Sequence, residues 1–124
     1  MRRVQFFGVM LSGFAIFQSS AGNAESVKDF WTQRAPIASY TSGKTALALE
    51  YCLGIAGSED GMPNVLRGEG ITLVSITGPS SIISTLMGFR ISDNGERRAI
   101  DVFARGSTLG TWERHSRRYI ESCV

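Results

Sequence analysis

The chain has 124 residues and a formal net charge of +2, which leaves room for one small domain and no strong charge excess. The excess comes from Arg2 and Arg3, because residues 25–124 hold 11 Lys and Arg against 11 Asp and Glu. This balance argues against nucleic acid as a partner, since a nucleic-acid-binding domain carries a basic surface. The sequence has no internal repeat and no low-complexity tract.

Residues 1–24 have the order of charged, apolar and small residues that is typical of a secretory signal peptide. Arg2 and Arg3 precede an uncharged apolar run from Phe6 to Phe17, and small or polar residues follow up to Ala24. The run is too short to span a bilayer as a helix. We expect cleavage after Ala24, or alternatively after Ala21, and export to the periplasm or the medium.

Residues 25–124 form the predicted domain, which opens with two helices. A short helix is expected near residues 26–31, ended by Pro36. The clearer helix runs over residues 42–56 and is rich in good helix formers. Its predicted inner face holds Ala46, Leu49, Cys52, Leu53 and Ala56. Residues 57–64 have the composition of a polar loop.

Strands are predicted next, at residues 71–77, 82–92 and 97–105, with Val65 and Leu66 as a short fourth strand or as part of the first. Asn94-Gly95 favours a two-residue hairpin turn. That turn would place Phe89 opposite Ile100 and Met87 opposite Val102. One face of the hairpin is then apolar and the other polar, and Leu86 and Phe103 at its base would need a cover.

The last predicted helix is residues 111–123, with an aromatic inner stripe and a charged outer face. The fold class is therefore α+β: a small single domain ordered helix, three or four antiparallel strands, helix. Both main helices would lie on one sheet face. The only two cysteines, Cys52 and Cys123, fall on the inner stripes, and an exported chain with two cysteines favours a disulfide.

Residues 38–45 (ASYTSGKT) fit a phosphate-binding loop if alanine is allowed at the first position. In such a loop backbone amides surround the phosphates and the lysine, here Lys44, reaches the outer ones. The preceding residues 31–37 contain Pro36 and do not read as a buried strand, and the domain is small for a nucleotide-binding sheet. We therefore expect no nucleotide and no other cofactor.

His115 is the only histidine, and it has Glu113 and several arginines as neighbours in the sequence. A histidine, a carboxylate and arginines are the components of a small acid–base phosphodiesterase site. These neighbours lie on one helix, whereas catalytic groups usually converge from several elements. The sequence offers no ligand set for a metal, and Glu59-Asp60 is interpreted as a solvated turn.

Seven arginines could form a basic interaction surface if the hairpin and the last helix adjoin. They are Arg90, Arg97, Arg98, Arg105, Arg114, Arg117 and Arg118. The alternative is a solvated surface, partly neutralised by neighbouring acidic residues.

Three hypotheses for function follow. The first is a non-enzymatic exported protein that binds an unknown protein partner in the cell envelope through a sheet face or a loop. The second is a small secreted hydrolase of phosphodiesters that uses His115 and nearby arginines. The third is a binder of anionic envelope surfaces. Convergence of His115 and the arginines in one cleft would favour the enzyme, and their spread over separate surfaces would favour binding.

Overall fold

The computed structural model describes residues 27–79 and 84–124, so the predicted signal peptide at residues 1–24 lies outside the described residues. Eight elements follow one another along the chain: α2 (Val27–Thr32), β1 (Ala38–Ser42), α3 (Ala46–Gly57), β2 (Met62–Gly68), β3 (Ile71–Thr77), β4 (Thr85–Asp93), β5 (Arg98–Ala104) and α4 (Thr111–Cys123). None of the helices in these ranges has the length and apolarity needed to cross a bilayer.

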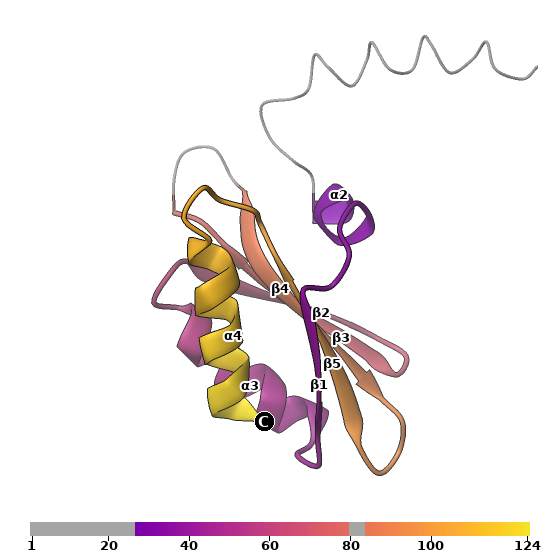
Figure 1. The fold of residues 1–124 in the computed structure, drawn as a ribbon. Helices are drawn as coiled ribbons and strands as arrows, with labels where there is room; N and C mark the ends of the chain where they lie inside the picture. The colour runs from indigo at the N-terminus through magenta and orange to yellow at the C-terminus, as the bar shows by residue number, and fades with distance from the viewer. Residues whose placement is uncertain (1–26, 80–83) are drawn as a thin grey trace, which may run out of the picture.

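The strands form one antiparallel sheet in the order β1-β5-β4-β3-β2. Helices α3 and α4 lie side by side on one face of the sheet, and α2 lies on the other (Figure 1). The α+β class and the placement of both main helices on one face are confirmed. The prediction of three or four strands is wrong, because the sheet has five.

The two strands at the sheet edges account for this difference. β1 pairs with β5, although its sequence ASYTS carries no apolar alternation beyond Tyr40. β2 includes Pro63 and Asn64, which sequence reasoning placed in a loop. An edge strand tolerates proline because its outer side donates no hydrogen bonds to a neighbouring strand. Pairing with β5 and with β3, rather than local propensity, makes these segments strands.

The β4–β5 hairpin has a wider turn than predicted. Asp93 pairs with Arg98, and the Asn94 amide donates to the Arg97 carbonyl at 3.1 Å, so four residues form the loop. Phe89 therefore pairs with Val102 instead of Ile100. The shift is two residues, which leaves every side chain on its predicted face. The wider loop supplies carbonyl groups that accept hydrogen bonds from the Arg98 guanidinium.

The main core fills the space between the sheet and helices α3 and α4. Its members are fully or almost fully buried: Leu49, Leu53, Val74, Ile76, Met87, Phe89, Ile91, Ile100, Val102, Tyr119, Ile120 and Cys123. A disulfide joins Cys52 to Cys123 with a Cα–Cα distance of 5.8 Å, as predicted. It links α3 directly to α4 at the C-terminal end of the chain.

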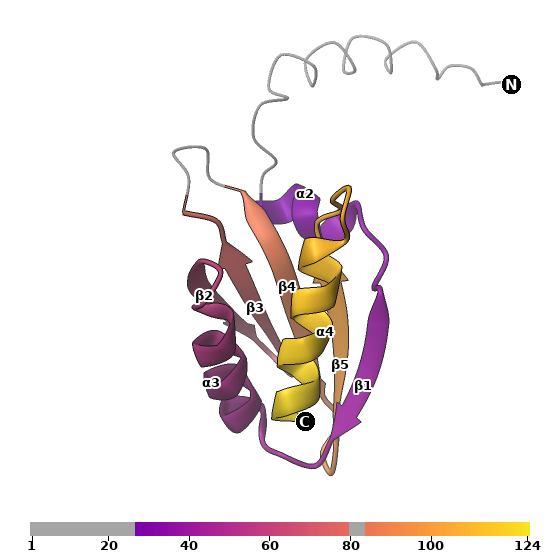
Figure 2. The same cartoon turned by 60° about the vertical axis from the view of Figure 1, so that its left-hand side comes forward.

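A smaller apolar cluster lies on the opposite face of the sheet, where α2 packs. Trp31 contacts the Phe103 ring edge-on at 5.2 Å, and Phe30 is fully buried. Gly88 permits this approach, since a Cβ there would lie 2.6 Å from the Trp31 ring. The expected cover over the base of the hairpin is therefore α2. Among the described residues, α2 is the one helix on this face, and it leaves β2 and β3 uncovered (Figures 1 and 2).

Candidate functional site

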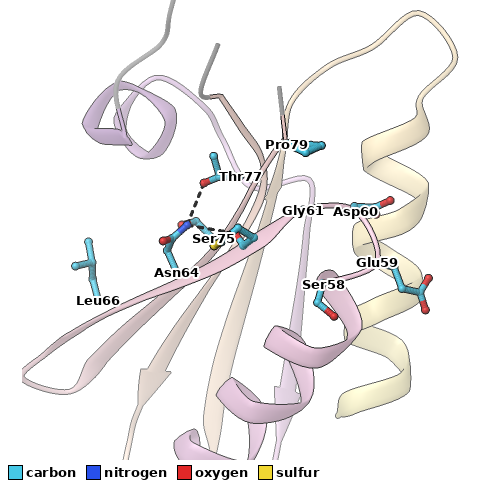
Figure 3. Close-up of a pocket in the computed structure, with 11 residues that line it drawn as sticks. Ser58, Glu59, Asp60, Gly61, Asn64, Leu66, Ser75, Thr77 and Pro79 are labelled. Carbon is cyan, nitrogen blue, oxygen red and sulfur yellow. Dashed lines mark hydrogen bonds between the residues drawn. The ribbon is translucent and has the colours of Figure 1, made fainter. Parts of the chain in front are cut away.

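A groove of about 840 Å³ lies at the corner of the sheet where α3 ends and β2 begins. Three parts of the chain form it: the α3–β2 turn, the helix-free face of β2 and β3, and the segment that follows β3 (Figure 3). Its lining residues are Ser58, Glu59, Asp60, Gly61, Met62, Asn64, Leu66, Ser75, Thr77, Gly78 and Pro79.

The strand side of the groove is neutral and partly apolar. Met62, Asn64 and Leu66 alternate along β2 and therefore point to the same face. The Asn64 amide nitrogen donates to the Thr77 hydroxyl at 3.1 Å and to the Met62 carbonyl at 3.2 Å (Figure 3). Met62 and Leu66 are largely exposed. This surface offers apolar contact together with fixed amide and hydroxyl groups.

The opposite side of the groove is acidic, but its carboxylates face elsewhere. Glu59 and Asp60 point toward α4 and away from Asn64 and Thr77 (Figure 3). One Asp60 carboxylate oxygen accepts a hydrogen bond from the Tyr119 hydroxyl at 2.7 Å. Burial, and then this hydrogen bond, raise the pKa of Tyr119 to about 12. Asp60 thereby fixes the α3–β2 turn to α4.

The same Asp60 oxygen also lies 2.8 Å from the Nδ1 of His115. The His115 ring is partly buried and packs edge-on against Trp112 and Tyr119. The interpretation of Glu59-Asp60 as a solvated turn agrees with the exposed Glu59 but is wrong for Asp60, because the Asp60 side chain is mostly buried against α4. A separation of 55 residues between Asp60 and His115 leaves no local signal for this contact.

The four arginines of the hairpin bond to groups within the protein. Arg90 forms an ion pair with Asp101 at 2.6 Å on the sheet face where α2 packs, and Arg97 donates to the Thr41 hydroxyl at 3.3 Å. Arg105 donates to the Thr85 carbonyl at 3.0 Å. These contacts hold three of the predicted surface cations against neighbouring strands.

Arg98, the fourth, is buried. Its guanidinium donates to the carbonyls of Gly43, Lys44, Gly95 and Glu96 and to the Asp93 carboxylate. It therefore joins the β4–β5 turn to the loop before α3, which is a structural role inside the domain. Local sequence gave no indication of this, because two of the acceptors, Gly43 and Lys44, lie 55 and 54 residues away in the chain.

The three arginines of α4 lie on the other side of the sheet from Arg90. Arg114 donates to the Leu109 carbonyl, and Arg117 donates to the Ile37 carbonyl at 3.0 Å. Arg118 is the one of the three that approaches the groove, since it lies 3.8 Å from Glu59. Arg98 is thus buried, the other six arginines are divided between separate surfaces, and the seven do not converge on His115.

Residues 31–37, which precede the phosphate-loop-like motif, form the end of α2 and a connecting segment and are not a buried strand, as expected. The strand β1 lies within the motif itself, at the edge of the sheet, and residues 43–45 connect it to α3. Lys44 extends its ammonium group to the Cys123 carbonyl at 2.8 Å, and the Thr45 hydroxyl accepts from the Ala48 amide as the N-cap of α3. The lysine of the loop thus connects it to α4, and the threonine caps α3.

The outer side of α3 carries a feature that sequence reasoning missed. Leu47, Tyr51 and Ile55 follow one another at successive turns and are 65%, 71% and 55% exposed. We call these three residues the α3 stripe. The sequence carries a signal for it, because α3 is apolar on all sides apart from Glu50, and such a helix is normally covered on all sides. The sequence prediction assigns only the inner face of this helix.

In the residues that the structure describes, no three His, Cys, Asp or Glu side chains gather in a way that could hold a metal ion. Comparison of the chain with protein-family models, with curated proteins and with solved structures gave no match. The features of the molecule that bear on function are therefore the groove, the Asp60–His115–Tyr119 contacts and the exposed surfaces.

Proposed function

We propose that this is an exported, non-enzymatic protein that binds a partner protein of the cell envelope in the groove beside β2 and β3. Export is supported by the order of residues in the N-terminal segment. It is also supported by the Cys52–Cys123 disulfide, since such bonds persist mainly in oxidising compartments. Periplasm and extracellular medium are both compatible with these features.

The observation that carries the proposal is the groove itself. Its volume lies within the range of sites that take a small ligand or a short peptide segment. Leu66 and Met62 supply apolar contact, while Asn64 supplies an amide that a peptide backbone could bond. The wall is built on two paired strands, so the binding surface is formed before the partner arrives.

The hydrolase hypothesis rests on one observation, the bond between Asp60 and His115. A carboxylate at Nδ1 orients an imidazole for proton transfer, as in many acid–base sites. The arginines that such a site would use on a phosphodiester are spread over both sides of the sheet. The same spread weakens the third hypothesis, because each arginine already donates to a group of the protein.

Site-specific photo-crosslinking in cells tests the binding proposal. A photoreactive amino acid at Leu66 is expected to give one defined adduct with an envelope protein. The same substitution at Leu109, which is 76% exposed and does not line the groove, is the matched control and should give no adduct. Equal adducts at both positions, or none at Leu66, would contradict the proposal.

Two further readings of the same experiment separate the alternatives. His115→Ala should leave the Leu66 adduct unchanged, and the purified protein should show no phosphodiesterase activity that this variant abolishes. An adduct that disappears steeply as salt rises would point to the anionic-surface hypothesis instead. An adduct that depends on neither His115 nor salt supports a neutral protein–protein contact.

A further inference from the structure

The loop between β4 and β5 contains the pair Asn94-Gly95, which is a reactive arrangement in a peptide chain. The backbone nitrogen that follows an asparagine can attack the side-chain carbonyl carbon and close a five-membered ring. A glycine in the second position leaves that nitrogen uncrowded, because glycine has no Cβ. Whether the ring forms in a folded protein depends on how the pair is held.

The structure leaves this pair open to water. Asn94 and Gly95 are both exposed, and a Cβ at Gly95 would meet no described atom within 4 Å. The strand pairing of β4 with β5 ends at Asp93 and Arg98, so the pair lies beyond it. The Gly95 N–H donates to the exposed Asp93 carboxylate at 3.0 Å. The attacking nitrogen is therefore held by one side chain at the surface and lies outside the hydrogen-bonded ladder of the sheet.

Asn64 is the other asparagine among the described residues, and it is held much more firmly. It pairs with Ser75 inside the β2–β3 ladder. Its side-chain amide donates to the Thr77 hydroxyl and to the Met62 carbonyl. Val65 follows it, and the branched Cβ of a valine crowds the adjacent backbone nitrogen. The two asparagines thus provide a reactive position and an unreactive control in the same chain.

We propose that Asn94 is a site of spontaneous modification, where the folded protein converts slowly to aspartate and isoaspartate. The Gly95 nitrogen bonds to the Asn94 Cγ, and the side-chain nitrogen leaves as ammonia with the proton of the Gly95 amide. Water then opens the ring at one of its two carbonyls. One opening leaves aspartate, and the other leaves isoaspartate, in which the main chain runs through Cβ and Cγ. The net reaction consumes one water, releases one ammonia and involves no oxidant or reductant.

Isoaspartate would disturb the groups that hold Arg98. The Arg98 guanidinium is buried and donates to the Gly95 carbonyl at 3.0 Å and to the Glu96 carbonyl at 3.1 Å. An extra main-chain carbon at position 94 comes directly before these two carbonyls and displaces them. A buried donor that loses its acceptors is destabilising. Because the same guanidinium also holds the carbonyls of Gly43 and Lys44, the disturbance would reach the loop before α3.

Intact mass and peptide mapping test the modification. The purified protein, with its disulfide intact, is kept in mildly alkaline buffer and sampled over several weeks. The peptide that contains Asn94 is expected to gain about 1 Da in a fraction that grows with time, and isoaspartyl methyltransferase should label this peptide. The peptide that contains Asn64 should keep its mass. Asn94→Ser should give neither the mass gain nor the label.

A peptide containing Asn94 that keeps its mass would overturn the proposal. Equal gains at Asn64 and Asn94 would also overturn it, since the reaction would then not depend on the exposed loop.

The part assigned to Arg98 has its own test. Ion exchange separates the converted molecules, which carry one more negative charge, and isoaspartate-containing molecules are then compared with Asn94→Asp. That variant carries the same added charge on an unaltered main chain. The urea midpoint of the isoaspartate form is expected to be lower than that of Asn94→Asp. Equal midpoints would show that isoaspartate leaves the acceptors of Arg98 in place, and this part of the proposal would be wrong.

Discussion

Helices α3 and α4 cover the same face of the sheet, yet their outer sides differ completely. α4 buries Ser116, Tyr119, Ile120 and Cys123 and exposes Arg114, Arg117, Arg118 and Glu121. α3 buries Leu49, Leu53 and Gly57 but exposes the α3 stripe. Glu50 is the one charged residue of α3, and its carboxylate accepts a hydrogen bond from the Arg67 guanidinium.

This difference separates a helix whose outer face is charged from one whose outer face is apolar. The charged outer face of α4 needs only water, because solvated charges have no cost of desolvation. The α3 stripe leaves large apolar surface in water, which is the usual mark of an interaction site. The experiments below test first what holds the two helices together, then the two sides of α3, and last the contact of α4 with the α3–β2 turn.

Removal of the disulfide should have the largest effect. The double substitution Cys52→Ser and Cys123→Ser opens a loop that spans 71 residues of sequence. The free energy of unfolding is expected to fall by about 4 kcal/mol, since the unfolded chain regains the entropy of that loop. Urea unfolding of both proteins measures the difference. A loss below about 1 kcal/mol would mean that the core alone holds α3 to α4.

Two glycines of α3 allow a packed position and an open position of the same helix to be compared. A Cβ at Gly57 would lie 2.3 Å from the Ile76 Cδ1, so Ile76 must move. Gly57→Ala is expected to destabilise the fold by about 1–3 kcal/mol. At Gly54 the nearest atom is the Pro63 Cβ at 3.8 Å, an ordinary contact. Gly54→Ala should stabilise the helix by about 0.5–1 kcal/mol.

Urea midpoints at low protein concentration compare these two variants, with the slope of each transition checked for constancy. Each variant is the control for the other, because both add one methyl group to the same helix. If Gly57→Ala were at least as stable as Gly54→Ala, the inner side of α3 would not be closely packed on β3. The two sides of α3 would then not differ in how closely they are packed.

The smallest expected effect is the pH dependence contributed by Tyr119. Its pKa is raised from 10.0 to about 12 in the folded state by burial and by the bond to Asp60. Because the folded state favours the neutral phenol, this stabilisation is fully present below pH 10 and is lost as the pH rises toward 12. Tyr119→Phe should therefore reduce the loss of stability across that interval.

Unfolding free energies measured at the two ends of this interval provide the test. The pKa of Tyr40 is also raised, by burial and by its bond to Glu121, so some alkaline loss will remain in Tyr119→Phe. Tyr51→Phe, at an exposed position, is the control and should behave as the wild type. Parallel curves for all three proteins would mean that burial and the bond to Asp60 do not raise the pKa of Tyr119 in the folded state.

The elements that sequence predicted best are those whose burial is periodic. The bounds of α4 and β3 agree with the prediction, because an amphipathic helix and a β-branched strand between glycines carry their own signals. β1 and β2 carry no such signal, since an edge strand gains its structure from its neighbour. Asp60, Arg98 and the α3 stripe were missed for a related reason: their surroundings are defined by segments far apart in the chain.

The strand order has a consequence for how the chain can fold as it is synthesised. β1 is the first strand made, but its only neighbour in the described sheet is β5, some 60 residues later. Cys123, the partner of Cys52, lies 71 residues later at the end of α4. The two contacts cannot form before β5 and α4 have been made, and such long-range pairing slows folding. Truncation before Cys123 would therefore remove the disulfide and the hydrogen bond of Lys44 to α4 together.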